Sequence, residues 1–149
     1  MSKLLILIYK VVYVLNKWKI PLIPDFINKI FIRLLFGCQI GTGAKIGKKV
    51  ILGYGGLGVV IHPRAVIDDF VNIGPGVVIG GTSGKYEVPK VGENTIISAG
   101  AKVIGPITIG KNCMIGANAV VTTNIPDNSL AVGLPAKVIK TNINIDDYR

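Results

Sequence analysis

Residues 91–126 read VGENTIISAGAKVIGPITIGKNCMIGANAVVTTNIP, with an aliphatic residue at every sixth position. These positions are Val91, Ile97, Val103, Ile109, Ile115 and Val121. A period of six fits neither an α-helix, with about 3.6 residues per turn, nor a strand that alternates every second residue. It is typical of a coil in which a short strand and a turn bring the chain back to the same inward direction. The stretch therefore predicts a parallel β-helix, an all-β solenoid.

The same period extends toward the N-terminus, with two interruptions. The aliphatic positions there are Ile40, Ile46, Leu52, Ile61, Ile67, Ile73 and Ile79. Nine residues separate Leu52 from Ile61, so three extra residues are expected to bulge out around residues 54–58. Residues 81–90 are polar and rich in Gly and Pro, which predicts a projecting loop. Loops held on a rigid scaffold often carry function, although tolerated insertion is the alternative interpretation.

The first 37 residues differ in composition from the repeats, with six basic side chains and one acidic one. Lys3, Lys10 and Lys17 recur every seven residues, and a similar polar stripe follows Pro24, so we predict two short amphipathic helices, at 4–15 and 26–35. The first apolar run is too short to span a bilayer, which takes about 20 residues, and no small-residue cleavage site follows it. Their wide apolar faces are expected either to pack on the β-helix or a neighbouring subunit, or to lie on a membrane with Trp18 at the headgroups. The expected organisation is a helical segment at 1–37, a β-helix domain at 38–139 and a tail at 140–149.

Composition narrows the classes of function. The 149-residue chain is 50% hydrophobic and 17% charged, which argues against disorder. Its net charge of +9 is diffuse and forms no Arg-rich run, which favours anionic lipid or a nucleotide phosphate over nucleic acid as a partner. Two cysteines do not make a disulfide framework, so Cys113 is interpreted as core and a reducing, cytoplasmic location is expected. A single histidine argues against a three-histidine zinc site unless the metal is shared across a three-fold axis, and no metal is predicted.

Several segments together resemble the hexapeptide-repeat acyltransferases, and most closely the serine acetyltransferases and the O-acetyltransferases of polysaccharide biosynthesis. The segments are GVVIHPRAVI (58–67), VIGGT (78–82), SAGAKVIGPITIG (98–110), IGANAVV (115–121) and VGLPAKVI (132–139). The resemblance covers roughly residues 38–140 and includes loop positions and the closing segment as well as the period.

This resemblance implies a left-handed β-helix, a homotrimer and acetyl-CoA as the donor of the acyl group. In the family, the pantetheine arm lies in the groove between two subunits. The matching positions imply that small residues line this arm and that Lys137 lies near the phosphates. The implied lining residues are Gly80, Gly81, Ser98, Ala99 and Ala117. For Gly and Ala, turn geometry alone is the alternative interpretation, and for Lys137 it is a solvated surface lysine.

The two loops depart from the serine acetyltransferase pattern. That pattern has an Asp-His-Ala-Thr-Gly turn and a second histidine before a later proline, whereas this chain has GYGGLG at 53–58 and KYEVP at 85–89. Because both histidines are missing and the N-terminal segment is short, we expect a sugar or polysaccharide precursor as acceptor, with serine as the alternative. A non-catalytic trimeric scaffold is the alternative of another class.

The expected reaction is direct attack of an acceptor hydroxyl on the thioester, assisted by a general base. Imidazole titrates at about pH 6.5, near working pH, so His62 is the candidate base. Tyr54, in the inserted turn, is the second candidate, to orient the acceptor or to donate to the oxyanion. The alternative for His62 is a hydrogen-bonded corner residue with no role in chemistry.

Overall fold

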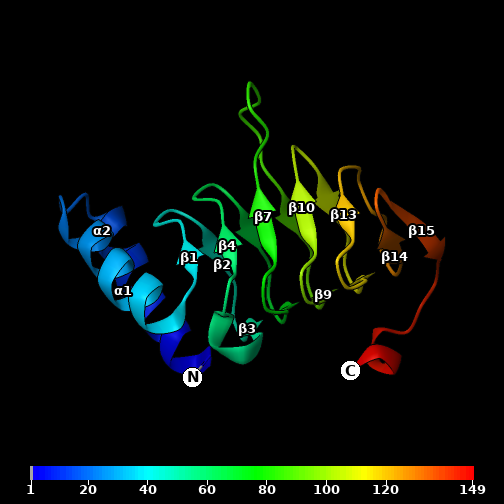
Figure 1. Ribbon diagram of the computed structural model, residues 1–149, viewed down its shortest axis with the longest axis horizontal. Coiled ribbons are helices and arrows are strands. Elements are labelled where there is room, and N and C mark those ends of the chain that lie inside the picture. The colour runs from blue at the N-terminus through cyan, green and yellow to red at the C-terminus, as the bar shows by residue number, and fades with distance from the viewer. Residues whose placement is uncertain (1) are drawn as a thin grey trace.

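The computed structural model describes residues 2–149 and shows a parallel β-helix capped by helices at its N-terminal end (Figure 1). Three parallel sheets form its sides. The first sheet holds β1 (Gln39–Ile40), β4 (Val60–Ile61), β7 (Val78–Gly80), β10 (Lys102–Ile104) and β13 (Val120–Val121). The second holds β2 (Lys45–Ile46), β5 (Val66–Ile67), β8 (Lys90–Val91) and β11 (Thr108–Ile109). The third holds β3 (Ile51–Leu52), β6 (Asn72–Ile73), β9 (Ile96–Ile97), β12 (Met114–Ile115), β14 (Leu130–Gly133) and β15 (Ala136–Lys140).

The predicted winding and its core are confirmed. Each coil runs through the three sheets in turn, and the fold is the left-handed parallel β-helix of hexapeptide-repeat proteins. The aliphatic residues at every sixth position pair in register from coil to coil, for example Ile61 with Ile79 and Ile79 with Val103. All of those from Ile61 to Val121 are fully or almost fully buried. Stacking between neighbouring coils therefore supplies most of the stability, as in other solenoids.

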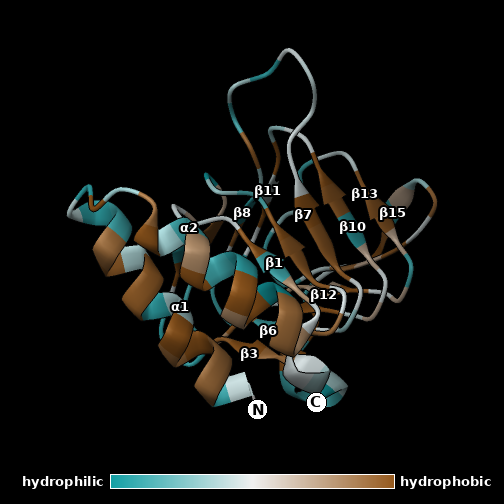
Figure 2. Ribbon diagram, turned by 60° about the vertical axis from the view of Figure 1, so that its left-hand side comes forward, coloured by the Kyte–Doolittle hydropathy of each residue, from teal (hydrophilic) through white to brown (hydrophobic). Residues whose placement is uncertain are grey.

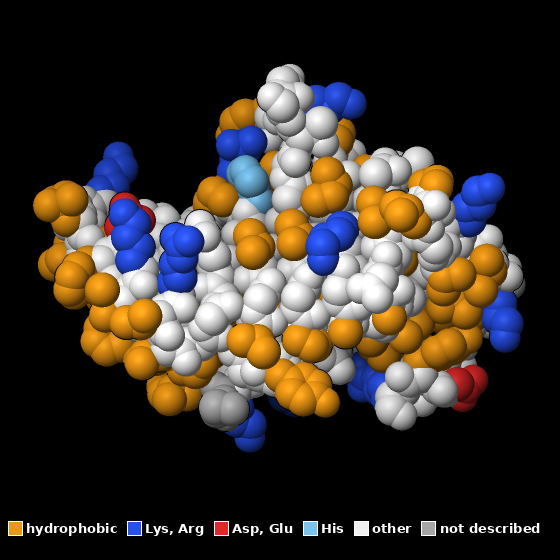
Figure 3. All heavy atoms as spheres, viewed as in Figure 1, with side chains coloured by type: hydrophobic (Ala, Val, Ile, Leu, Met, Phe, Trp, Pro, Cys, Tyr) orange, Lys and Arg blue, Asp and Glu red, His pale blue; other side chains and the backbone are white. Residues whose placement is uncertain are grey.

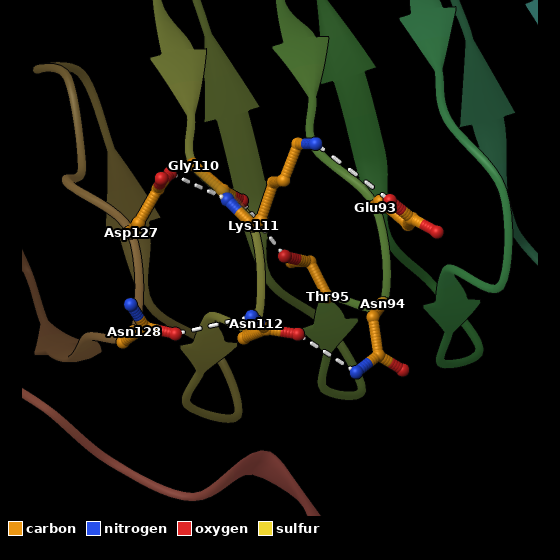
Figure 4. Close-up of polar contacts among 8 residues, drawn as sticks. All are labelled: Glu93, Asn94, Thr95, Gly110, Lys111, Asn112, Asp127 and Asn128. Carbon is orange, nitrogen blue, oxygen red and sulfur yellow. Dashed lines mark hydrogen bonds and ion pairs between the residues drawn. The ribbon is translucent and has the colours of Figure 1, made fainter.

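The edge between the second and third sheets is held by a ladder of polar side chains (Figure 4). The Asn94 amide donates to Asn112 at 2.8 Å, and the Asn112 amide donates to Asn128 at 3.0 Å. All three asparagines have φ between 52° and 61°, a left-handed conformation that Asn tolerates better than most residues. The Asp127 carboxylate accepts from the Lys111 backbone N–H at 2.8 Å, which ties the last two coils together. Hydrogen bonds that hold neighbouring coils together therefore account for the polar side chains of this edge.

Both predicted interruptions are present. Residues between β3 and β4 form a short 3₁₀ element, η2 (Gly53–Gly56), with Tyr54 and Gly55 at positive φ. The chain between β7 and β8 leaves the solenoid as the loop that rises highest above the sheets in Figure 1. The base of this loop is anchored, because Val88 and Pro89 are buried.

The first helix, α1 (Ser2–Lys17), is longer at both ends than predicted. It packs against the first coils through Leu5, Ile6, Tyr9 and Val12. The Tyr9 hydroxyl lies 2.9 Å from the Gly41 carbonyl oxygen and 2.6 Å from that of Ala44, to which it donates. The inner face of α1 therefore packs on the β-helix, as one of the two alternatives predicted.

The second helical segment differs from a single regular helix. It comprises α2 (Ile23–Ile27), with Pro24 in its first turn, followed by a π-helical segment, η1 (Asn28–Leu34). The Asn28 side chain donates to the Ile40 carbonyl at 2.7 Å, and Ile32 is buried. We call α1, α2 and η1 the helical cap; it closes the first coil, as Figure 2 shows from a second side. No helix among the described residues is long and apolar enough to cross a membrane.

The C-terminal end of the solenoid is closed by an antiparallel strand and not by α-helices. Strand β15 turns back antiparallel on β14, unlike every other pairing in the sheets. A final 3₁₀ element, η3 (Ile145–Tyr148), follows, and its Ile145 is buried.

Candidate active site

The predicted site residues fall on two of the three edges of the solenoid. We call the corner from the first to the second sheet the histidine edge; it holds His62 after β4, Gly80 at the end of β7 and Gly81 directly after it. We call the corner from the third to the first sheet the tyrosine edge; it holds Tyr54 after β3, Ser98-Ala99 after β9 and Ala117 after β12. These two edges bound opposite sides of the first sheet, so one chain does not bring His62 and Tyr54 together.

His62 is half-buried at the histidine edge, at the base of the projecting loop. Its Nδ1 accepts a hydrogen bond from the Arg64 backbone N–H at 3.1 Å. A Cβ placed on Gly81 would lie 3.7 Å from His62 Nε2, so that nitrogen faces the first residue of the loop. Desolvation, and then the nearby charge of Arg64, lower the pKa of His62 below its usual 6.5. The ring is therefore neutral at pH 7 and, with Nδ1 accepting, carries its proton on Nε2.

Arg64 holds the projecting loop against the coil that carries His62. Its guanidinium donates to the Tyr86 carbonyl oxygen from Nε at 3.1 Å and from Nη2 at 2.6 Å. The same group lies 4.4 Å from the centroid of the Tyr86 ring, a cation–π contact. Sequence reasoning missed this contact, because Arg64 and Tyr86 are 22 positions apart and both are exposed.

The tyrosine edge presents a strip of small side chains beside one exposed phenol. Tyr54 is 83% exposed. Gly74 stands one coil further along the edge, and a Cβ there would come within 2.5 Å of the Ala99 backbone nitrogen, so successive coils stack closely. Ala99 and Ala117 are exposed, and the Ala99 carbonyl accepts from Asn118 N–H at 2.9 Å. An extended, thin ligand fits along Ser98, Ala99 and Ala117 because their side chains are short.

Lys137 lies at the far end, on β15, where it pairs with Val132 of β14 and is exposed. Its position next to the last coils is compatible with the role that the resemblance implies.

A polar hollow that sequence reasoning did not identify lies between the helical cap and the histidine edge. Its lining residues are Asp25, Asn28, Lys29, Arg33, Gln39, Gly41, Thr42 and Pro63. Pro63 directly follows His62, and Figure 3 shows the histidine, in pale blue, at the base of the projecting loop. The cap thus supplies charges of both signs close to the candidate base. In the sequence, the signals that could have indicated this hollow are the polar stripe of the second predicted helix and Pro63.

Neither a metal nor a reactive thiol is indicated among the described residues. Within residues 2–149, no three His, Cys, Asp or Glu side chains gather in a way that could hold a metal ion. Both cysteines are buried, which confirms the prediction for Cys113. Burial raises the pKa of Cys38 to about 11 and also raises that of Cys113, so neither thiol is activated.

Comparison with known proteins agrees with this geometry. A family described as bacterial transferase hexapeptide (six repeats) matches residues 89–123. The chain has the hexapeptide-repeat fold. It is 37% identical over 142 residues to a serine acetyltransferase of Synechococcus elongatus, covering 93% of this chain and 57% of the relative. It is 45% identical over 111 residues to one of Staphylococcus aureus, covering 72% of this chain and 51% of the relative.

Comparison with solved structures also supports the hexapeptide-repeat fold. A serine acetyltransferase structure in complex with CoA superposes with a TM-score of 0.82 at 33% identity, covering 91% of this chain and 55% of that one. The predicted resemblance is confirmed. The chain spans about half the length of the curated relatives it matches. These relatives are named as serine acetyltransferases, which supports the predicted alternative better than the sugar acceptor that the missing histidines suggested.

Proposed function

We propose that this chain transfers the acetyl group of acetyl-CoA to the hydroxyl of serine. The observation that carries the proposal is the 37% identity to a serine acetyltransferase, which extends over 93% of the chain. The acceptor oxygen attacks the thioester carbonyl carbon and the carbon–sulfur bond breaks. CoA leaves as the thiolate and receives the proton that the acceptor hydroxyl gives up.

His62 is the proposed base for this reaction. Its lowered pKa keeps it neutral at pH 7, as a base must be. To accept a proton at Nε2 the ring must first carry its proton on Nδ1, which breaks the bond from the Arg64 N–H. Losing one such bond costs about 1 kcal/mol, or about five-fold in rate, which is small against the rate increase of about 10²–10⁴-fold that general-base catalysis typically contributes.

We propose that the complete site forms between copies of the chain. His62 and Tyr54 lie on different edges, so the tyrosine edge of one copy must face the histidine edge of the next to combine them. An interface between two different surfaces forms a closed ring when the successive rotations add up to a full turn, and the ring that the family resemblance implies is a homotrimer. The strip at Ser98, Ala99 and Ala117 would then hold the pantetheine arm, with Gly80-Gly81 opposite it and Lys137 at the nucleotide end. Acetyl-CoA supplies the activated acyl carbon.

The polar hollow supports an amino-acid acceptor. A serine zwitterion carries one ammonium and one carboxylate, and the hollow offers Asp25 for the first and Lys29 and Arg33 for the second. A neutral sugar uses neither charge. The hollow therefore favours serine on grounds independent of the comparisons.

The test is acetyl transfer by the purified protein, followed by release of the CoA thiol and by the mass of the acetylated product. We expect turnover with L-serine and little with a panel of neutral sugars. His62→Ala should lower kcat by about 10²–10⁴-fold, and Asp25→Asn should raise KM for serine. Lys111→Ala, on the edge with the asparagine ladder, is the matched control. Turnover with a sugar but not serine would overturn the acceptor, and CoA binding without any turnover would favour the non-catalytic scaffold.

A further inference from the structure

The exposed apolar side chains of this protein are concentrated on the helical cap. Of the 21 exposed large hydrophobic residues among the described residues 2–149, 12 lie before position 36. Those of the cap itself are Leu4, Leu7, Val11, Val14, Ile23, Phe26, Ile30, Phe31 and Leu34, which we call the outer apolar face. Figure 3 shows hydrophobic side chains gathered over this end of the molecule. Isolated exposed leucines are ordinary, but a contiguous face of this size marks an interaction surface.

On α1 the outer apolar face is a narrow stripe with a basic border. Leu4, Leu7, Val11 and Val14 follow one another at alternating spacings of three and four, so they line one side of the helix. Leu5, Tyr9 and Val12 occupy the opposite, buried side. Lys3, Lys10 and Lys17 are spaced by seven, and Lys3 and Lys10 each precede a stripe residue by one, so the three lysines run along one margin of the stripe. Lys10 lies against Leu7, Val11 and Val14.

Charge decides whether a second copy of the chain or an anionic lipid surface covers the outer apolar face. Residues 1–37 hold Lys3, Lys10, Lys17, Lys19, Lys29 and Arg33 against Asp25, which is +5 from six bases and one acid. A second copy would bring another +5 against the first, which opposes association. An anionic lipid surface attracts the same charges and accepts the apolar side chains below its headgroups.

We infer that the outer apolar face docks on an anionic lipid surface, with α1 lying in the plane of the membrane. Trp18 is 70% exposed between Lys17 and Lys19 at the end of α1, where an indole prefers the headgroup level. Peripheral contact is the only mode open to these helices, because none among the described residues can span a bilayer. The cap closes one end of the solenoid, so the opposite end stays free. The residues tested for docking lie on α1, whereas Asp25, Lys29 and Arg33 of the proposed serine site lie outside it, so the docking test does not depend on the acetyl transfer proposed above.

The experiment is co-sedimentation of the full chain with vesicles of phosphatidylglycerol and phosphatidylcholine in equal parts, against phosphatidylcholine alone. We expect binding to the anionic vesicles, weakened by high salt, and little binding to the neutral ones. Lys10→Gln/Lys17→Gln should weaken binding about 30-fold, from about five-fold per lysine. Lys45→Gln/Lys90→Gln, an equal loss of exposed charge on the second sheet, is the matched control and should have little effect.

A second pair of variants tests the apolar stripe. Leu7→Glu/Val11→Glu should weaken binding by about 100-fold or more, because the stripe must enter the headgroup layer. Both side chains are at least 50% exposed, so the fold is retained, as thermal unfolding would verify. Ile139→Glu, 56% exposed on β15, is its control. The inference is overturned if the wild type binds neither vesicle or both equally. It is also overturned if light scattering gives the wild type a larger assembly than Leu7→Glu/Val11→Glu, since a second copy would then cover the face.

Discussion

The contact between Arg64 and Tyr86 gives the most direct test of how the projecting loop is positioned. Arg64 makes two hydrogen bonds to the Tyr86 carbonyl, at 3.1 and 2.6 Å, and a cation–π contact at 4.4 Å. Arg64→Met keeps a side chain of similar length but removes the donors and the charge. Buried Val88 holds the base of the loop, so only its outer part should be released.

The expected effect can be estimated from these contacts. An exposed cation–π contact contributes about 0.5–1 kcal/mol, and the hydrogen bonds to a single oxygen together add about 1–1.5 kcal/mol. Removing about 2 kcal/mol should increase the open fraction of the loop about 30-fold. Arg64→Lys keeps the charge but not the planar fork of donors, so it should fall between the wild type and Arg64→Met.

Cleavage after Lys85 by a lysine-specific protease measures this open fraction, provided that the loop recloses faster than it is cut. We expect Arg64→Met to be cut about 30-fold faster at Lys85, with the fragments identified by mass. Lys49→Met removes a comparable contact, between Lys49 and the Phe70 ring at 5.3 Å, without touching the loop, and should leave the rate unchanged. A rate for Arg64→Met within two-fold of the wild type would show that Arg64 does not hold the loop.

Three further outcomes are expected. Because the pKa of His62 is lower in the native state than 6.5, the native chain binds fewer protons than the unfolded chain below that pH, and the free energy of unfolding should fall as pH drops through 6.5. His62→Gln should remove this part of the pH dependence, measured by urea unfolding at several pH values. Ile97 is fully buried, so Ile97→Ala should lower the free energy of unfolding by about 2–5 kcal/mol in the same assay. Cys38 and Cys113 should not react with a disulfide reagent near pH 7 until denaturant is added; rapid labelling of the native protein would contradict their burial.

The winding of the chain could be predicted because its cause is local and repeated. Each of Ile97, Val103 and Ile109 must return to the same core, so its spacing reports the length of one side of the coil. The two interruptions were visible for the same reason, as breaks in that spacing. The structure of the helical cap was harder to predict from the sequence, because a π-helical segment such as η1 leaves no distinct period there. The Asn28 contact with Ile40 joins the cap to the first coil, and only tertiary structure shows it.

The sequence indicates which residues are candidates for the site, but it does not show how they are arranged in space. The identities of His62 and Tyr54 follow from the interrupted repeats, yet which edge each occupies depends on where the chain turns. The hydrogen bond from Arg64 N–H to His62 Nδ1 sets the tautomer, and a sequence does not contain that information. The hollow lined by Asp25 and Arg33 forms between the cap and the first coil, so it requires both to be placed.

The separation of the two edges constrains the reaction more than any single residue does. A side chain at the tyrosine edge cannot act on an acyl group held at the histidine edge of the same copy, because the first sheet lies between them. If both Tyr54 and His62 contribute, an inactive His62→Ala chain and an inactive Tyr54 variant must regain activity when assembled together, since some interfaces then contain both wild-type edges. If His62 works with the hollow of its own copy alone, mixing gives only the average of the two preparations. The mixing experiment therefore separates a shared site from a site within one chain.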